Sequence, residues 1–406
     1  MYFMITRRGF LRHSVAFSAG AALAPILTGC GADNALTLRI QLLNRSLPLR
    51  LIGQFRKSLP TGNRLAVVPE AQLAQIFDLL KTWQTIAQGE EVNQPWWNQI
   101  PVVGKPLPSP ANLVSLGDVW LKSAIKQNFI QPFREVEQWQ GWDNLPTPWQ
   151  NVVRRNGEGH YDGQGEIWGA PYRWGNTLIA YHQDALRSLK WTPQDWGDLW
   201  HPDLRDRLTV INQPREIIGL TLKKLGYSYN TPDLNAVPEL LPELKKLAQQ
   251  IKFYSSTHYL QPLVIKDAWV AVGWSSDILP LMRQHPQIKA VVPASGTARW
   301  VDLWVKPQGT NNPALDPLLQ QWVEFYWQNP SAQNITLNTS GTSPILLTRD
   351  RSTLPPDLQD QPLRLPPAEV IENSEFLLPL PDSTGQQYEE FWRAMRTANL
   401  HTTSPS

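Results

Sequence analysis

The sequence predicts an α/β protein of more than one domain, and three observations lead to that prediction. The chain has 406 residues, which at roughly 150 residues per domain corresponds to two or three domains. Hydrophobic residues make up 42% of it and charged residues 18%, a balance typical of globular proteins and unlike coiled coils or disordered chains. Strand-like and helix-like segments alternate along the chain, and that order is typical of α/β folds.

Residues 1–29 are predicted to be an export signal. Thr6 precedes the pair Arg7 and Arg8, which is typical of twin-arginine signals, and a short stretch of apolar and small residues follows. The segment Leu-Thr-Gly-Cys that ends at Cys30 resembles a bacterial lipobox, in which Cys30 is lipidated and becomes the first mature residue. The alternative is an ordinary signal peptide with an unrelated cysteine. No later stretch reaches the ~18 apolar residues of a membrane span, so we expect membrane contact through the lipid anchor only.

The charge balance argues against a nucleic-acid partner. The formal net charge is +2, and removing the positive charges of Arg7, Arg8 and Arg12 with the signal leaves −1 on the rest of the chain. A nucleic-acid-binding protein carries a strong basic excess instead. The single cysteine also excludes an intrachain disulfide and a zinc cluster built on thiolates.

The first part of the mature chain follows a β-α-β-α order. Residues 70–87 carry apolar side chains at helical spacing, and residues 36–43 show the partial alternation of a strand. Farther on, a glycine-rich turn within residues 161–172 indicates a hairpin. The predicted strands are 36–43, 65–68, 112–115 and 177–181, and the predicted helices are 49–59, 70–87 and 119–128, with further alternation from residue 193.

The sequence contains no motif of a known catalytic or metal site. The nearest approach to a Gly-x-Ser-x-Gly nucleophile motif, at residues 273–277, lacks the last glycine. The seven histidines form no His-x-His or His-Glu-x-x-His motif. We therefore expect neither an enzyme nor a bound metal or cofactor. The 19 tryptophans, in contrast, supply aromatic faces that attract cations, as a receptor for an alkylammonium ligand requires.

Motifs between residues 165 and 310 carry a resemblance to a known family. They include Gly-Ala-Pro-Tyr-Arg-Trp-Gly at 169–175, Trp-Gly-Asp-Leu-Trp-His-Pro at 196–202, Ala-Val-Gly-Trp-Ser-Ser-Asp at 271–277 and Arg-Trp-Val-Asp-Leu-Trp-Val at 299–305. In this order they resemble the spermidine/putrescine-binding proteins of bacterial ABC importers. The resemblance weakens before residue 150 and after residue 330.

The resemblance implies a two-lobed fold of the periplasmic-binding-protein type. Each lobe is expected to hold a mixed sheet flanked by helices, and crossover strands are expected to join the lobes as a hinge that closes on ligand. Residues 36–171 plus 301–345 are expected to form lobe 1. Residues 172–300 plus 346–400 are expected to form lobe 2.

The resemblance also implies a ligand site made of carboxylates and indole rings. Glu216 and Asp302 occupy positions of ammonium-binding acids, Trp274 and Trp300 those of stacking aromatics, and Gln213 stands where these receptors have a second acid. Other roles remain open: Glu216 near a helix start can cap that helix, and either tryptophan can belong to the core. Asp302 lies in an apolar run, where a buried carboxylate needs a partner, and a ligand ammonium is one candidate.

The lobe-1 side of the site departs from these receptors, and Asp118 or Trp120 can substitute for the missing contacts there. We expect a monomeric, lipid-anchored periplasmic receptor that captures a polyamine and delivers it to the membrane permease subunits of an ABC importer. Two alternatives remain. One is the same fold binding a less cationic or an anionic solute, and the other is a non-transport role as a lipoprotein scaffold or a secreted enzyme.

Overall fold

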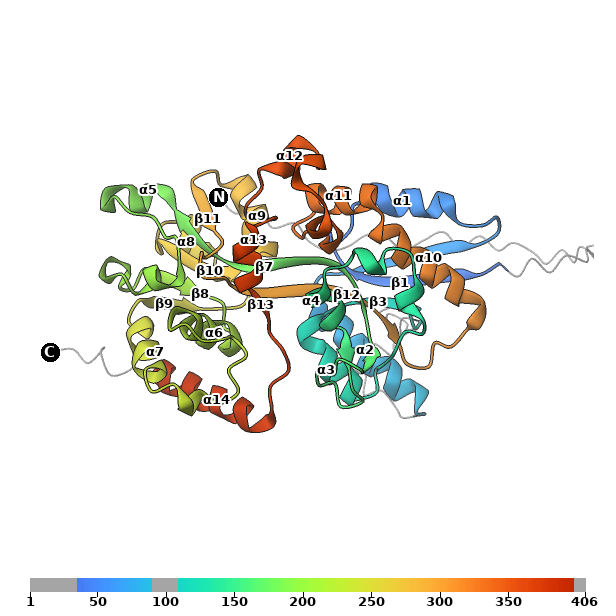
Figure 1. Ribbon diagram of the computed structural model, residues 1–406, viewed down its shortest axis with the longest axis horizontal. Helices are drawn as coiled ribbons and strands as arrows, with labels where there is room; N and C mark the ends of the chain where they lie inside the picture. Colours follow the sequence, from blue (N-terminus) through green and yellow to red (C-terminus); the bar gives the residue numbers. More distant parts are fainter. Residues whose placement is uncertain (1–34, 90–108, 398–406) are drawn as a thin grey trace, which may run out of the picture. The chain divides into compact units, whose positions relative to one another are not determined.

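The computed structural model describes residues 35–89 and 109–397, and within them the chain folds around one large mixed sheet (Figure 1). The main strands follow the spatial order β2-β1-β3-β12-β7-β10-β8-β9. Three further strands join at the sides: β4 (Ile130–Gln131) and β13 (Glu375–Phe376) pair with β12, and β11 (Ile288–Val291) pairs with β7.

The N-terminal part of the sheet has the predicted β-α-β-α order. β1 (Thr37–Leu43) pairs in parallel with both β2 (Arg64–Glu70) and β3 (Leu113–Gly117). Apolar residues at helical spacing place Ile76, Leu80 and Trp83 on one buried face of α2. The helices of this part are α1 (Leu49–Ser58), α2 (Leu73–Ala87) and α3 (Asp118–Lys126). The predicted strands and helices of this part are confirmed, with small shifts at their ends.

The second part of the sheet is built on one long strand, β7 (Ala170–His182). β7 is antiparallel to β10 (Val270–Trp274), which pairs in parallel with β8 (Leu208–Val210), and β9 (Ile251–Tyr254) continues the parallel order. β7 starts before the predicted strand 177–181. Its residues are buried over nearly its whole length, so the alternation that marks a half-exposed strand is missing.

The predicted hairpin around residues 161–172 takes a different pairing. β5 (Arg154–Arg155) and β6 (Glu166–Ile167) form a short antiparallel pair on either side of the glycine-rich turn. The paired strand before the turn therefore lies outside the predicted range.

β7 and β12 (Ala298–Pro307) connect two hydrophobic cores. On β7, Tyr172 and Trp174 pack in the first core, and residues 178–180 pack in the second. On β12, Val301 and Trp304 belong to the first core and Ala298 to the second. The two strands pair with each other in antiparallel fashion, so together they form the connection between the halves (Figure 1).

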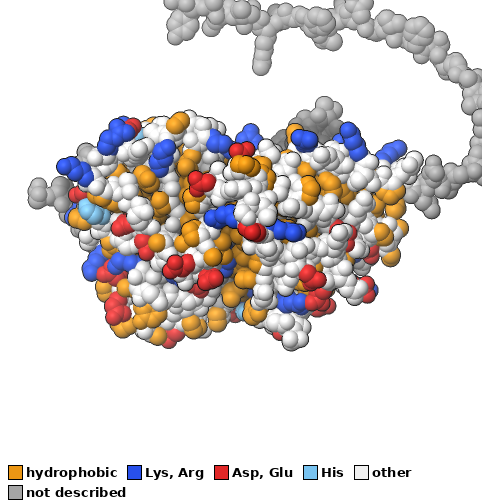
Figure 2. All heavy atoms as spheres, turned by 45° about the horizontal axis from the view of Figure 1, so that its top comes forward, with side chains coloured by type: hydrophobic (Ala, Val, Ile, Leu, Met, Phe, Trp, Pro, Cys, Tyr) orange, Lys and Arg blue, Asp and Glu red, His pale blue; other side chains and the backbone are white. Residues whose placement is uncertain are grey.

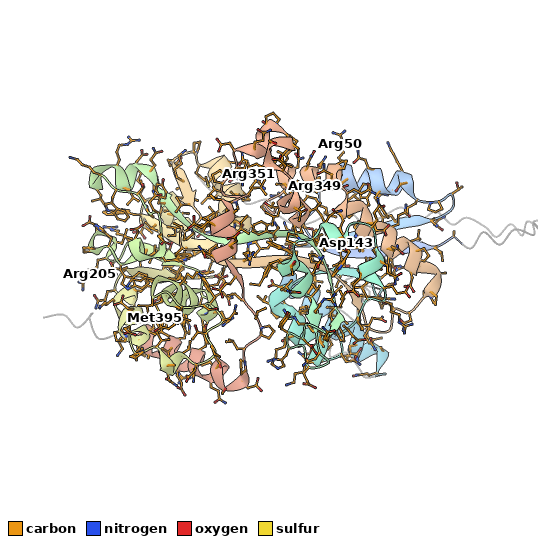
Figure 3. The ribbon with its side chains drawn as sticks, in the orientation of Figure 1. Arg50, Asp143, Arg205, Arg349, Arg351 and Met395 are labelled. Carbon is orange, nitrogen blue, oxygen red and sulfur yellow. The ribbon has the colours of Figure 1, made fainter. Side chains whose placement is uncertain are left out.

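The C-terminal segment contributes to both cores. The first core includes Leu346, Leu354, Leu358, Leu365 and Phe376, and the second includes Tyr388 and Met395 of α14 (Asp382–Thr397; Met395 is labelled in Figure 3). These first-core positions lie in the range 346–400 that was predicted for lobe 2. The division of the chain into lobes stays a prediction.

Further helices surround the sheet, and on the face that Figure 2 shows, acidic and basic side chains are interspersed. No helix in residues 35–89 or 109–397 has the length and apolar character to cross a membrane. The remaining α-helices are α4 (Thr147–Asn151), α5 (Gln183–Leu186), α6 (Pro214–Lys224), α7 (Leu240–Ala248), α8 (Gln261–Val264), α9 (Ser275–Gln284), α10 (Asp316–Trp327), α11 (Asn329–Asn338), α12 (Pro356–Gln359) and α13 (Ala368–Asn373).

Candidate functional site

Three alternate positions on β7 organise the predicted site. Arg173, Gly175 and Thr177 are two residues apart along the strand, so they share one face of the sheet. The register of the sheet sets a predicted site residue beside each of them: Asp302 beside Arg173, Trp300 beside Gly175, and Trp274 beside Thr177. Residues from β10 and β12 are thereby brought into one row on the strand that connects the two cores.

At one end of this row, Glu216 accepts two hydrogen bonds. The indole Nε1 of Trp274 donates to Oε1 at 3.0 Å, and the Thr177 hydroxyl donates to Oε2 at 2.9 Å. Burial raises the pKa of the Glu216 carboxyl, and the two hydrogen bonds oppose that rise. Glu216 lies in the first turn of α6, but its carboxylate is directed to the β7 row, and the helix start has no side-chain capping bond. The capping alternative is therefore not the geometry observed.

At the other end, Asp302 forms a buried ion pair with Arg173. Arg173 Nε donates to Asp302 Oδ2 at 2.7 Å, and Arg173 Nη2 lies 2.6 Å from the same oxygen. Each side chain is only 3% exposed. Burial raises the pKa of the Asp302 carboxyl, and the charge and hydrogen bond of Arg173 act against that rise. The partner that a buried carboxylate needs is thus supplied here by the chain itself.

Trp300 lies between these two ends and depends on a glycine. A Cβ at Gly175 would lie 2.4 Å from Cζ2 of Trp300 and 2.2 Å from Oγ of Ser275, so a larger residue does not fit without a shift. The Arg173 guanidinium carbon is 5.6 Å from the centroid of the Trp300 ring, within the range of a cation–π contact. Trp300 Nε1 is buried and has no hydrogen-bond partner in the described part of the chain.

The backbone of Trp274 is also fixed by a hydrogen bond, which it donates to Tyr259. The Tyr259 hydroxyl donates to Asp277 Oδ2 at 2.9 Å and accepts the Trp274 backbone N–H at 3.2 Å. A Cβ at Gly273 would lie 2.0 Å from the Tyr259 ring, so the glycine permits this packing. Sequence reasoning did not identify Tyr259, Asp277 or Arg173 as part of this arrangement.

On the first-core side, the structure brings Asp118 to β12. Asp118 begins α3, and its Oδ1 accepts the backbone N–H of Val301 at 3.2 Å, between the two predicted β12 site residues. Burial raises the pKa of Asp118 to about 7, while the Val301 hydrogen bond and the charge of Arg155 act in the opposite direction. The Arg155 side chain is itself buried, and its Nε and Nη1 have no hydrogen-bond partner among the residues described.

Of the other two predicted residues, Gln213 is not brought into the row, whereas Trp120 lies near its Asp302 end: a Cβ at Gly117 would lie 3.7 Å from Trp120 Cδ1 and 4.0 Å from Asp302 Oδ1. The ring of Trp120 packs on Phe77 with centroids 4.7 Å apart, and Gln213 is exposed at the N-cap of α6. Cys30, Arg7 and Arg8 lie outside the described residues. Within residues 35–89 and 109–397, no group of three or more His, Cys, Asp or Glu side chains is placed to hold a metal ion.

The sequence of the chain is similar to those of known solute-binding proteins. Residues 109–374 match the family described as bacterial extracellular solute-binding proteins. The spermidine/putrescine-binding periplasmic protein of Salmonella typhimurium is 25% identical over 229 residues, which cover 56% of this chain and 64% of that protein. The putrescine/cadaverine-binding protein of Pseudomonas aeruginosa is 26% identical over 250 residues, 57% of this chain and 67% of that protein. The match to the Salmonella protein thus spans less than two thirds of its length.

Solved structures share the fold. A spermidine/putrescine ABC transporter substrate-binding protein from Streptococcus pneumoniae superposes with a TM-score of 0.70 at 17% identity, over 90% of this chain and 99% of that one. A periplasmic thiamin binding protein superposes with a TM-score of 0.55 at 14% identity, over 91% of this chain and 98% of that one. The predicted two-lobed α/β fold of the periplasmic-binding-protein type is confirmed.

Proposed function

The chain belongs to the family of bacterial extracellular solute-binding proteins, and from that membership we propose that it is the polyamine receptor of an ABC importer. The family is one of solute-binding proteins, which confirms the prediction that the chain is not an enzyme. In this proposal the protein is a monomer outside the cytoplasmic membrane, tethered through a lipidated Cys30, and it delivers its ligand to permease subunits. The names of the similar Salmonella and Pseudomonas proteins support spermidine, putrescine or cadaverine as the ligand class.

The observation that carries the proposal is the environment of Glu216. This carboxylate is buried, its two hydrogen-bond donors are neutral, and it takes part in no ion pair among the described residues. The charge of Arg215 acts on this carboxylate without a direct ion pair, so an ammonium group of a ligand would supply the contacting cation that the ionised carboxylate lacks. Trp274 is partly exposed beside it, so its ring can contact both the ammonium and the alkyl chain.

The two crossover strands give this site its mechanism of capture. Glu216 and Trp274 belong to elements packed in the second core, whereas Asp118 and the β12 residue Val301 belong to the first-core side. A ligand that contacts both sides favours the closed arrangement of the lobes, and closure removes water from the charged contacts. Scattering measurements should show a smaller radius of gyration when a saturating ligand is added.

A thermal-shift screen of the purified protein tests the proposal. Spermidine, putrescine and cadaverine are compared with amino acids, sugars and anions, because a ligand at 100 times its Kd stabilises a protein by about 2.7 kcal/mol. Calorimetry should then show at least a tenfold loss of affinity for Glu216→Gln. The matched control is Glu239→Gln, an exposed carboxylate at the start of α7. If no amine binds, or if Glu216→Gln binds amines like the wild type, the proposal is wrong.

A second candidate is a receptor of the same fold for a less cationic solute. The ion pair between Arg173 and Asp302 favours it, because one of the two predicted ammonium-binding acids already has a cation. The amino acids and anions in the screen distinguish the two candidates.

A further inference from the structure

We infer that Arg173 takes the place of one ligand ammonium at Asp302, so that this receptor selects amines with a single ammonium group over diamines. The inference rests on the proposed capture of amines, and it revises the ligand class within that proposal from polyamines to amines with one ammonium group. It assigns the charge selectivity of the site to a residue of the crossover strand β7.

Arg173 makes both contacts that a ligand cation would make at this end of the row. Its guanidinium donates to the Asp302 carboxylate at 2.7 Å and lies over the Trp300 ring at 5.6 Å. A carboxylate and an aromatic face together are what recognise an alkylammonium group. The Asp302 carboxylate and the Trp300 ring were both predicted to contact the ligand. In the structure the Arg173 guanidinium makes both contacts instead.

The packing around Arg173 holds it in that position. The backbones of Trp174 and Thr342 exchange two hydrogen bonds of 2.8 Å, which set the loop after α11 against β7. In that loop, a Cβ at Gly341 would lie 3.0 Å from Cδ of Arg173, so the backbone of Gly341 is closely packed on the arginine side chain. To move aside, Arg173 would have to leave its buried partner, and separating a buried ion pair is costly.

The charges along the row then differ between its two ends. Glu216 at one end has neutral donors only, whereas Arg173 and Asp302 at the other end neutralise each other. The nearby Asp277 carboxylate accepts the Tyr259 hydroxyl, and Asp118 accepts the Val301 amide. A second ammonium would approach the guanidinium of Arg173 and be repelled by it, while an uncharged group at that end would not.

Two amines of equal chain length test this inference. Putrescine and 4-amino-1-butanol share a four-carbon chain and differ by one ammonium group. Calorimetry on the wild-type protein should give at least tenfold tighter binding of 4-amino-1-butanol. Arg173→Leu should reverse the preference. Asp302 then lacks a cation, and only the diamine has a second ammonium group to pair with it. Arg173→Lys keeps the positive charge and should keep the wild-type preference.

The double variant Arg173→Leu/Asp302→Asn controls for folding. It carries neither charge of the pair, so it avoids the unpaired buried carboxylate that could prevent Arg173→Leu from folding, and it should bind the two amines with similar affinity. Tighter binding of putrescine by the wild type, or an unchanged preference in the double variant, overturns the inference and leaves the amine-receptor function standing. If neither amine binds to any of these proteins, the proposed function and the inference both fail.

Discussion

Asp118→Asn is predicted to stabilise the folded protein at pH 8 and to leave its stability nearly unchanged at pH 4. Asp118 is buried at the start of α3, where its carboxylate accepts the Val301 amide. The charged groups that act on it are Arg155 from β5 and Asp302 from β12. Asparagine has nearly the same shape and keeps an oxygen for the Val301 amide, so the substitution removes mainly the charge.

The magnitude follows from the pKa of Asp118, which burial raises from 3.8 to about 7. In the unfolded chain the carboxyl loses its proton near its ordinary pKa, whereas the folded protein keeps the proton up to about pH 7. The free energy of unfolding therefore falls as the pH rises through this window. At about 1.4 kcal/mol for each pKa unit, the loss is on the order of 4 kcal/mol by pH 8. The asparagine side chain cannot ionise, so the variant should not lose this stability.

Urea unfolding followed by tryptophan fluorescence at pH 4, 6 and 8 measures the effect. The difference in unfolding free energy between variant and wild type should grow with pH, because the other titrating groups are common to both proteins. The control is Asp143→Asn, an exposed carboxylate in the short 3₁₀ helix Trp142–Asn144 (Figure 3), and it should show no such trend. A variant that is destabilised by the same amount at every pH would refute the reasoning.

Three further changes have expected outcomes. Gly175→Ala should lower the unfolding free energy by about 1–3 kcal/mol in urea unfolding, because its Cβ would lie 2.4 Å from the Trp300 ring; wild-type stability would contradict this. Thr177→Val leaves the buried Glu216 carboxylate with one donor fewer, so it should cost about 1–3 kcal/mol in the same assay, and an unchanged midpoint would argue against that role. Cys30→Ser should release the protein from membranes in cell fractionation, whereas a processed variant that stays membrane-bound would exclude the lipobox.

The order of elements was predictable where hydrophobic periodicity differs between helix and strand. α2 shows this, because only one of its faces is buried and its apolar residues recur at helical spacing. β7 shows the limit: it is buried on both faces and crosses between two cores, so neither its length nor its start is visible in the local pattern. The short pairing of β5 with β6 was missed for a related reason, since two-residue strands are too short to show any period.

The sequence supplies candidate site residues, and these stay predictions, but it does not supply their pairing. The sequence indicates that Asp302, in an apolar run, needs a partner, and a ligand ammonium is the candidate that the resemblance suggests. Arg173 lies 129 residues earlier in the chain, and it meets Asp302 only because β7 and β12 are adjacent and in this register. A shift of one residue along β7 would direct the arginine to the opposite face of the sheet. The register of the sheet thus determines which residue pairs with Asp302. It thereby also determines how much charge is left at this end of the site for a ligand.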